Sequence, residues 1–156
     1  EAVMDVNKIQ KLHLVPKIES LFNGDVSGKH FALWGLSFKP NTDDMREAPA
    51  LYMIEALLAK GASISAFDPE AMPNAKSILG DRVKFVENQY DAINGADALI
   101  IATEWNEFRT PDFEKMAATM NNKFIFDGRN LFDLEQMEQL GFHYESVGRK
   151  VVRIPA

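Results

Sequence analysis

The sequence predicts a doubly wound α/β domain, in which a mostly parallel β-sheet is covered by helices on both faces. Short, nearly continuous apolar segments alternate along the chain with segments whose apolar residues recur at helical spacing. This alternation of strands and helices is typical of parallel sheets. The apolar segments lack the polar-apolar alternation of a half-exposed strand, so both faces of the sheet should be buried.

Residues 5–22 are predicted to be helical. The apolar residues of this segment recur at three-residue steps and are Val6, Ile9, Leu12, Val15, Ile18 and Leu21. Pro16 falls inside the stripe, so the segment either bends there or contains a second helix with Pro16 in its first turn. The stripe is already under way at the first residues. We therefore expect a piece of a longer protein, with residues 1–24 ending a linker helix and residues 25–156 forming the α/β domain.

The other elements follow in alternating order. The predicted strands are residues 30–38, 62–67, 83–86, 97–102, 123–126 and 142–147. The predicted helices are residues 47–60, residues 89–94, a segment that starts at Thr110 with Pro111 behind this cap, and residues 134–140. For the helix at 47–60, Asp43 or Asp44 can serve as N-cap, Pro49 lies in the first turn, and Gly61 suits the position after the C-terminus.

Composition excludes several function classes. The 156 residues are 46% hydrophobic and contain no apolar run near the roughly 20 residues of a membrane helix. No secretory signal is present in the sequence, so we expect a cytoplasmic protein. The net charge of −6 disfavours nucleic acid as a partner. No cysteine is available as nucleophile or metal ligand, and the three histidines are far apart, so no metal site is predicted.

The most informative segment is the loop of residues 35–49, which follows a predicted strand. Ligands bind α/β sheets outside the carboxyl ends of strands, although this loop lacks the glycine spacing of the common phosphate-binding fingerprints. It is longer than a strand-to-helix connection requires, and its charged residues are Lys39, Asp43, Asp44, Arg46 and Glu47.

Two cations of this loop are candidates for ligand binding. Lys39 precedes a proline, which favours an extended backbone, and it is either a solvated lysine or a cation aimed at a ligand. Arg46 lies at the predicted helix start, where a cation opposes the helix dipole. It therefore requires an anionic partner, which is either a ligand phosphate or a carboxylate of Asp43 or Glu47.

Polar residues also follow three other predicted strands. Residues 103–109 contain two aromatic residues, which either pack in the core or contact a ligand. After the next strand, Gly128 allows a close backbone approach, and Arg129 should project from the same edge of the sheet as Lys39. Together these two cations predict a site for an anion or pyrophosphate. Asp68 stands where a dinucleotide site has its ribose-binding acid, but without the glycine fingerprint a capping role is favoured.

Three segments together resemble a known family. Residues 35–49, 103–109 and 126–130 are similar, in the same order, to segments of the C-terminal domain of the UDP-glucose/GDP-mannose dehydrogenase family, and the resemblance covers essentially the whole chain. It implies a Rossmann-like domain that helps to hold a sugar nucleotide. In this family a long central helix connects that domain to an N-terminal NAD-binding domain, and the nucleotide sugar is oxidised twice at C6 with two NAD.

The resemblance also implies roles for individual residues. Phe38, Lys39 and Arg129 match substrate-contacting positions, and Arg46 matches a position that reaches the NAD held mainly by the other domain. The family nucleophile is a cysteine, which this chain lacks, so we expect no catalytic residue here and an inactive isolated chain. The implied partners are UDP-glucose, NAD and the protein's own N-terminal domain, within a homo-oligomer.

Within the family, residues 40–46 and 103–109 are most similar to the enzymes that form UDP-glucuronate from UDP-glucose for polysaccharide biosynthesis. Two alternatives remain open. One is a dehydrogenase of another nucleotide sugar, GDP-mannose or UDP-N-acetyl-mannosamine. The other is a non-catalytic nucleotide-binding or assembly module. The sequence preceding Glu1 would discriminate between an enzyme and such a module.

Overall fold

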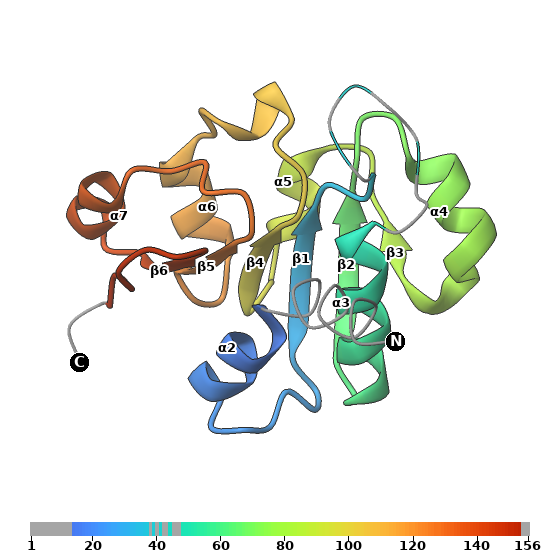
Figure 1. Ribbon diagram of the computed structural model, residues 1–156, viewed down its shortest axis with the longest axis horizontal. Coiled ribbons are helices and arrows are strands. Elements are labelled where there is room, and N and C mark those ends of the chain that lie inside the picture. Colours follow the sequence, from blue (N-terminus) through green and yellow to red (C-terminus); the bar gives the residue numbers. More distant parts are fainter. Residues whose placement is uncertain (1–13, 38, 40, 42–43, 45–47, 154–156) are drawn as a thin grey trace.

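The fold is a six-stranded parallel sheet with helices on both faces (Figure 1). The computed structural model describes residues 14–37, 39, 41, 44 and 48–153. The strand order is β3-β2-β1-β4-β5-β6, so the predicted doubly wound architecture is confirmed. None of the helices in the described ranges is both long and apolar enough to span a membrane.

The elements are short and follow one another closely. The strands are β1 (His30–Trp34), β2 (Ser63–Phe67), β3 (Lys84–Phe85), β4 (Ala98–Ile101), β5 (Phe124–Asp127) and β6 (His143–Ser146). The α-helices are α2 (Leu14–Leu21), α3 (Pro49–Ala59), α4 (Met72–Leu79), α5 (Gln89–Ile93), α6 (Phe113–Thr119) and α7 (Leu134–Leu140), and the 3-10 turns are η1 (Gly80–Arg82) and η2 (Asn106–Phe108).

The sheet separates two apolar cores, because successive side chains of a strand point to opposite faces. Phe31 and Leu33 of β1 pack with α2, α3 and α4 in one core. Ala32 and Trp34 of the same strand pack with α5, α6 and α7 in the other. Both faces of β1 are therefore buried, which explains its continuous apolar sequence.

The C-terminal segment returns to the sheet beyond β6. Val152 forms an isolated antiparallel bridge with Tyr144 of β6. The Tyr144 N–H donates to the Val152 carbonyl at 2.8 Å, and the Val152 N–H donates to the Tyr144 carbonyl at 2.9 Å. This segment therefore lies along the outer side of the edge strand.

The start of α3 differs from the sequence prediction. The N-cap is Ala48, with no side-chain cap, and Pro49 is the first helical residue, so neither Asp43 nor Asp44 takes the N-cap position. Proline needs no cap for its own nitrogen, since it has no N–H to satisfy. The prediction for the C-terminus is confirmed, because Gly61 has a φ of 90°. Its N–H donates to the Leu58 carbonyl, as a Schellman ending requires.

Two other helix predictions need correction. α6 has Asp112 as its N-cap, whose side chain accepts from the Lys115 N–H. The predicted cap at Thr110 was therefore two residues early, and Pro111 precedes the true cap. α4 was not predicted, because its buried face consists of little more than Ala75 and Leu79, a pattern too weak to recognise as helical.

The first described helix has Pro16 in its first turn, which is one of the two arrangements predicted for this proline. α2 begins at Leu14, so Pro16 is its third residue and lies in its first turn, where an N–H would have no intrahelical acceptor. Leu14, Val15 and Ile18 are buried against the sheet. The earlier part of the predicted helical stripe lies outside the described residues, and the division of the chain at residue 24 stays a prediction.

Candidate functional site

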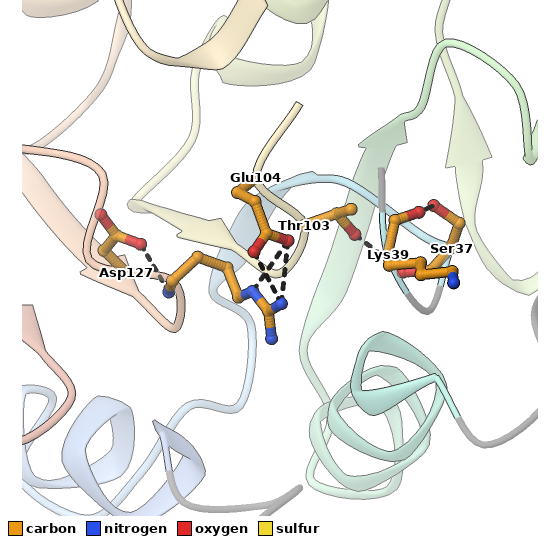
Figure 2. A network of polar contacts seen from close by, with 6 residues as sticks. Ser37, Lys39, Thr103, Glu104 and Asp127 are labelled. Atoms are coloured by element: carbon orange, nitrogen blue, oxygen red, sulfur yellow. Dashed lines mark hydrogen bonds and ion pairs between the residues drawn. The ribbon is translucent and has the colours of Figure 1, made fainter. Parts of the chain in front are cut away.

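The candidate site lies at the carboxyl edge, by which we mean the edge of the sheet where its parallel strands end. The strand order reverses between β1 and β4, and α/β proteins bind ligands where such a reversal occurs. Figure 2 shows the polar residues here, with Ser37 and Lys39 following β1, Thr103 and Glu104 following β4, and Asp127 ending β5.

The loops after β1 and β4 touch directly. Gly35 has a φ of 97°, and a Cβ at this position would lie 2.5 Å from the Thr103 Cβ and 2.7 Å from its backbone nitrogen. The Thr103 hydroxyl donates to the Ser37 carbonyl at 2.8 Å. Only glycine allows the backbone at position 35 to come this close to Thr103. The loops after β1 and β4 therefore form one packed unit at the strand reversal.

Asp68, directly after β2, organises this unit from a fully buried position. Its Oδ2 accepts from the backbone N–H groups of Leu36 at 2.7 Å and Ser37 at 3.2 Å, and from the Trp105 indole N–H at 3.2 Å. Its Oδ1 accepts from the N–H groups of Glu70 and Ala71, both at 2.8 Å. One carboxylate therefore holds the strand-end segments that follow β1, β2 and β4.

The predicted capping role of Asp68 accounts for only part of these contacts. The bonds to Glu70 and Ala71 form the turn before α4, as a local cap would. The bonds to Leu36, Ser37 and Trp105 span 31 to 37 residues of sequence, and sequence reasoning missed them. The interpretation of Trp105 as a packing residue is partly confirmed, since it lies in the second core but also donates this hydrogen bond.

Arg129 is held by two acidic residues of neighbouring strand ends. Its backbone N–H donates to Asp127 Oδ1 at 2.8 Å. Its guanidinium donates to Glu104, with Nε 3.1 Å from Oε1 and Nη2 2.8 Å from both carboxylate oxygens. The side chains of Arg129 and Glu104 are 33% and 28% exposed, so a ligand can reach the pair.

The ion pair changes the ionisation of Glu104. Burial acts to raise the pKa of its carboxyl group, but the hydrogen bonds and charge of Arg129, with a smaller contribution from Arg109, outweigh burial and lower the pKa. Glu104 is therefore a carboxylate at neutral pH, and it neutralises much of the Arg129 charge in the described site.

A network of hydrogen bonds that includes the buried Tyr144 holds the Asp127 side chain in place. The Tyr144 hydroxyl donates to Asp127 Oδ2 at 2.7 Å and accepts from Arg149 Nη2 at 2.6 Å. Burial first, and then the Asp127 charge, raise the pKa of Tyr144, so its hydroxyl remains a donor. Asp127 Oδ2 also accepts from the Leu131 N–H at 2.7 Å. The loop that carries Arg129 is thus fixed on both sides of that residue.

The structure places the predicted site residues as follows. Lys39 and Arg129 both follow strands at the carboxyl edge, as predicted, and the β4 segment with Glu104 comes between their strands. Lys39 has an exposed side chain, and its carbonyl accepts from the Ser37 hydroxyl at 2.8 Å. The predicted positions Phe38 and Arg46 lie outside the described residues.

Gly128 makes a close backbone approach, but to the protein itself. Its N–H donates to the Ile101 carbonyl at 2.9 Å, and a Cβ would lie 3.2 Å from that oxygen. Glu104 was not singled out from the sequence as a partner of Arg129. Its place three residues after the end of the buried strand β4 was the available signal.

Comparison with known proteins now identifies the family. Residues 32–134 match the UDP-binding domain of the UDP-glucose/GDP-mannose dehydrogenase family. The chain belongs to this family. The predicted resemblance is therefore confirmed, and the strand-end segments described above all lie within the matched range.

Relatives extend the family match to nearly the whole chain. The UDP-glucose 6-dehydrogenase TuaD of Bacillus subtilis is 42% identical over 153 residues, which is 98% of this chain and 33% of that protein. The UDP-glucose 6-dehydrogenase of Pseudomonas aeruginosa is also 42% identical, over 95% of this chain and 34% of its own length. The chain thus spans about a third of these relatives.

A solved structure from the same family has the same fold. The UDP-glucose dehydrogenase of the hyperthermophilic archaeon Pyrobaculum islandicum is 35% identical and superposes with a TM-score of 0.73. The similarity covers 83% of this chain and 28% of that structure. The doubly wound sheet is therefore the fold of a dehydrogenase domain of this family.

Proposed function

We propose that this chain is the C-terminal, sugar-nucleotide-binding part of a UDP-glucose 6-dehydrogenase. The intact enzyme oxidises UDP-glucose to UDP-glucuronate with two NAD. The observation that carries this proposal is the 42% identity to the Bacillus subtilis enzyme over 98% of the chain, because a match of that extent takes in every strand-end segment of the site. Two other family substrates, GDP-mannose and UDP-N-acetyl-mannosamine, are the competing candidates.

The proposed substrate contacts are Phe38, Lys39 and Arg129. UDP-glucose carries a diphosphate, and the chain as a whole has a net charge of −6, so binding requires local cations at the carboxyl edge. Lys39 is exposed and offers a compact ammonium, and Arg129 offers a planar guanidinium. Charge-assisted hydrogen bonds of this type are about twice as strong as neutral ones.

NAD is proposed to bind mainly to the N-terminal part of the intact enzyme. In a dinucleotide-binding sheet the acid after β2 bonds the ribose, but here Asp68 is buried and its oxygens accept from protein donors of three strand-end segments. The described residues therefore do not fit a dinucleotide in the usual position on this sheet. Arg46, the proposed NAD contact of this chain, lies outside them.

Assays of the full-length protein test the proposal. We expect two NADH formed per UDP-glucose, a lower kcat/KM for GDP-mannose and UDP-N-acetyl-mannosamine, and no activity of the isolated 156-residue chain, which has no cysteine nucleophile. Preference for another nucleotide sugar would reassign the substrate. Absence of any oxidation by the full-length protein would favour a non-catalytic module.

Substitution of Arg129 tests the proposed contact separately. Arg129→Ala should mainly raise the KM for UDP-glucose, because a contact made equally in the ground and transition states contributes to binding. An unchanged KM would show that Arg129 does not contact the substrate, even if the full-length protein is a UDP-glucose dehydrogenase.

A further inference from the structure

Glu104 holds the Arg129 guanidinium by one edge only. Its two oxygens accept from Nε and Nη2 at 2.8 to 3.1 Å. Among residues 14–37 and 48–153, no group accepts a hydrogen bond from Nη1. An arginine has five N–H donors in a fixed planar arrangement, so the edge opposite Glu104 retains donors for another acceptor.

The Arg129 backbone is fixed independently of this ion pair. Asp127 accepts from the Arg129 N–H at 2.8 Å, and the Gly128 N–H donates to the Ile101 carbonyl at 2.9 Å. The backbone thus sets where the arginine side chain starts, and Glu104 sets where it ends. A flexible side chain held at both ends loses little conformational freedom when a ligand binds.

We propose that Glu104 is a positioning residue, which orients Arg129 so that its Nη1 edge meets an acceptor of the bound sugar nucleotide. This proposal rests on the proposed function, since it assumes that Arg129 contacts the substrate. The opposite role would be an internal competitor that the substrate must displace. Displacement would sacrifice three charge-assisted hydrogen bonds before any is gained, whereas positioning retains them while the free edge binds.

A double-mutant cycle in the full-length enzyme tests the proposal. The variants are Glu104→Gln, Arg129→Ala and their combination, and the readout is the KM for UDP-glucose at saturating NAD, together with kcat. Glu104→Gln removes the carboxylate charge at nearly constant size. We expect it to raise KM about tenfold in the wild-type background and less than about twofold in the Arg129→Ala background, because the two residues act through one contact.

Each other outcome overturns a specific claim. A lower KM in Glu104→Gln would identify Glu104 as a competitor. An equal rise in KM in both backgrounds would show that it acts through folding rather than through Arg129. Arg129→Ala with an unchanged KM would instead overturn the proposed substrate contact, so failure of the proposed function is distinguishable from failure of this inference.

Two further variants complete the experiment. Glu55→Gln is the matched control, because Glu55 forms a similar ion pair with Arg82, at 2.7 and 2.9 Å. Arg82 ends η1, one residue before β3 begins, so this pair lies at the end of the sheet opposite the carboxyl edge. Its loss should not change KM. If Glu104→Gln fails to fold, Glu104→Asp retains the charge at a shorter reach, and an unchanged KM in that variant would also overturn the proposal.

Discussion

The Asp68 carboxylate accepts a hydrogen bond from the Trp105 indole N–H at 3.2 Å. Asp68 follows β2 and Trp105 follows β4, and β1 lies between these two strands in the sheet. The bond therefore crosses the end of β1 and connects the two sides of the strand reversal. Both residues are buried, so water does not compete for the interaction.

Asp68→Asn should destabilise the protein. Both Asp68 oxygens accept from N–H groups, so the amide NH₂ of asparagine must face donors in either orientation. Each buried donor left unpaired costs about 1–3 kcal/mol. We therefore expect the free energy of unfolding to fall by about 2–5 kcal/mol, with a lower Tm of the full-length protein.

The matched control is Asp133→Asn, because Asp133 is an exposed N-cap that accepts from one N–H. This substitution should have little effect on stability. Equal changes in Tm would contradict the organising role of Asp68.

Gly35→Ala should destabilise the carboxyl edge. The new Cβ would clash with both the side chain and the backbone of Thr103, and the φ of 97° is unfavourable for alanine. Left-handed backbone and overpacking together predict a cost of about 2–5 kcal/mol, measured as the shift in thermal or urea unfolding.

Gly24→Ala separates the cost of a left-handed backbone from the cost of the steric clash in Gly35→Ala. Gly24 has a similar φ of 82°, but a Cβ added there would have no atom within 4 Å. The substitution should cost only about 1–2 kcal/mol, the backbone contribution. If the free energy of unfolding falls by the same amount in both variants, the close contact between Gly35 and Thr103 does not add to the cost of Gly35→Ala.

Lys39→Ala should reduce turnover in the intact enzyme far more than stability. The side chain is exposed, so its removal leaves no cavity. Loss of the proposed charge-assisted contact to the substrate would cost about 1.5–3 kcal/mol, which corresponds to a loss of roughly ten- to hundredfold in kcat/KM. Lys39→Arg should not restore activity, because a planar guanidinium does not replace a compact ammonium. Near-normal kinetics with a lower Tm would make Lys39 a structural residue.

His30 should make stability depend on pH below neutrality. Burial, with a smaller contribution from Lys84, lowers the pKa of His30 despite the opposing charge of Asp97. The ring nitrogens contact the hydroxyls of Ser63 and Ser65 at 2.7 and 2.8 Å. Because the unfolded chain takes up this proton first, the free energy of unfolding should fall as pH decreases through the unfolded value of about 6.5 and level off below the folded pKa.

Comparison with His30→Gln isolates this titration. Urea unfolding of the two proteins between pH 5 and pH 8 should show a steeper loss of stability on acidification in the wild type. Parallel curves, or a steeper loss in the variant, would contradict the assigned direction of the pKa shift.

The sequence predicted the sheet and the positions of Lys39 and Arg129 at its carboxyl edge, and the errors have a physical pattern. The continuous apolar runs of β1 and β4 identified strands buried on both faces, and α7 was predicted with the observed bounds. α4 was missed because only one alanine and one leucine form its buried face. Helix starts were misplaced where a proline supplied part of the signal.

Long-range polar contacts could not be derived from local patterns. Glu104 and Arg129 are 25 residues apart in sequence, and they meet only because β4 and β5 are adjacent strands. The sequence placed Lys39 and Arg129 on one edge of the sheet, yet it carried no indication that a carboxylate neutralises Arg129. Charge pairing of this kind depends on strand order, which periodicity does not specify.

The bridge between Tyr144 and Val152 has a consequence for assembly. It occupies outward-facing hydrogen-bonding groups of β6, and the strand at the opposite edge, β3, has only two residues. Exposed strand edges are templates for pairing with other chains, and both edges of this sheet are poor templates. Copies of this domain should therefore associate through helices and loops rather than by extending the sheet, and partly unfolded chains should resist edge-to-edge aggregation as long as residues 148–152 stay in place.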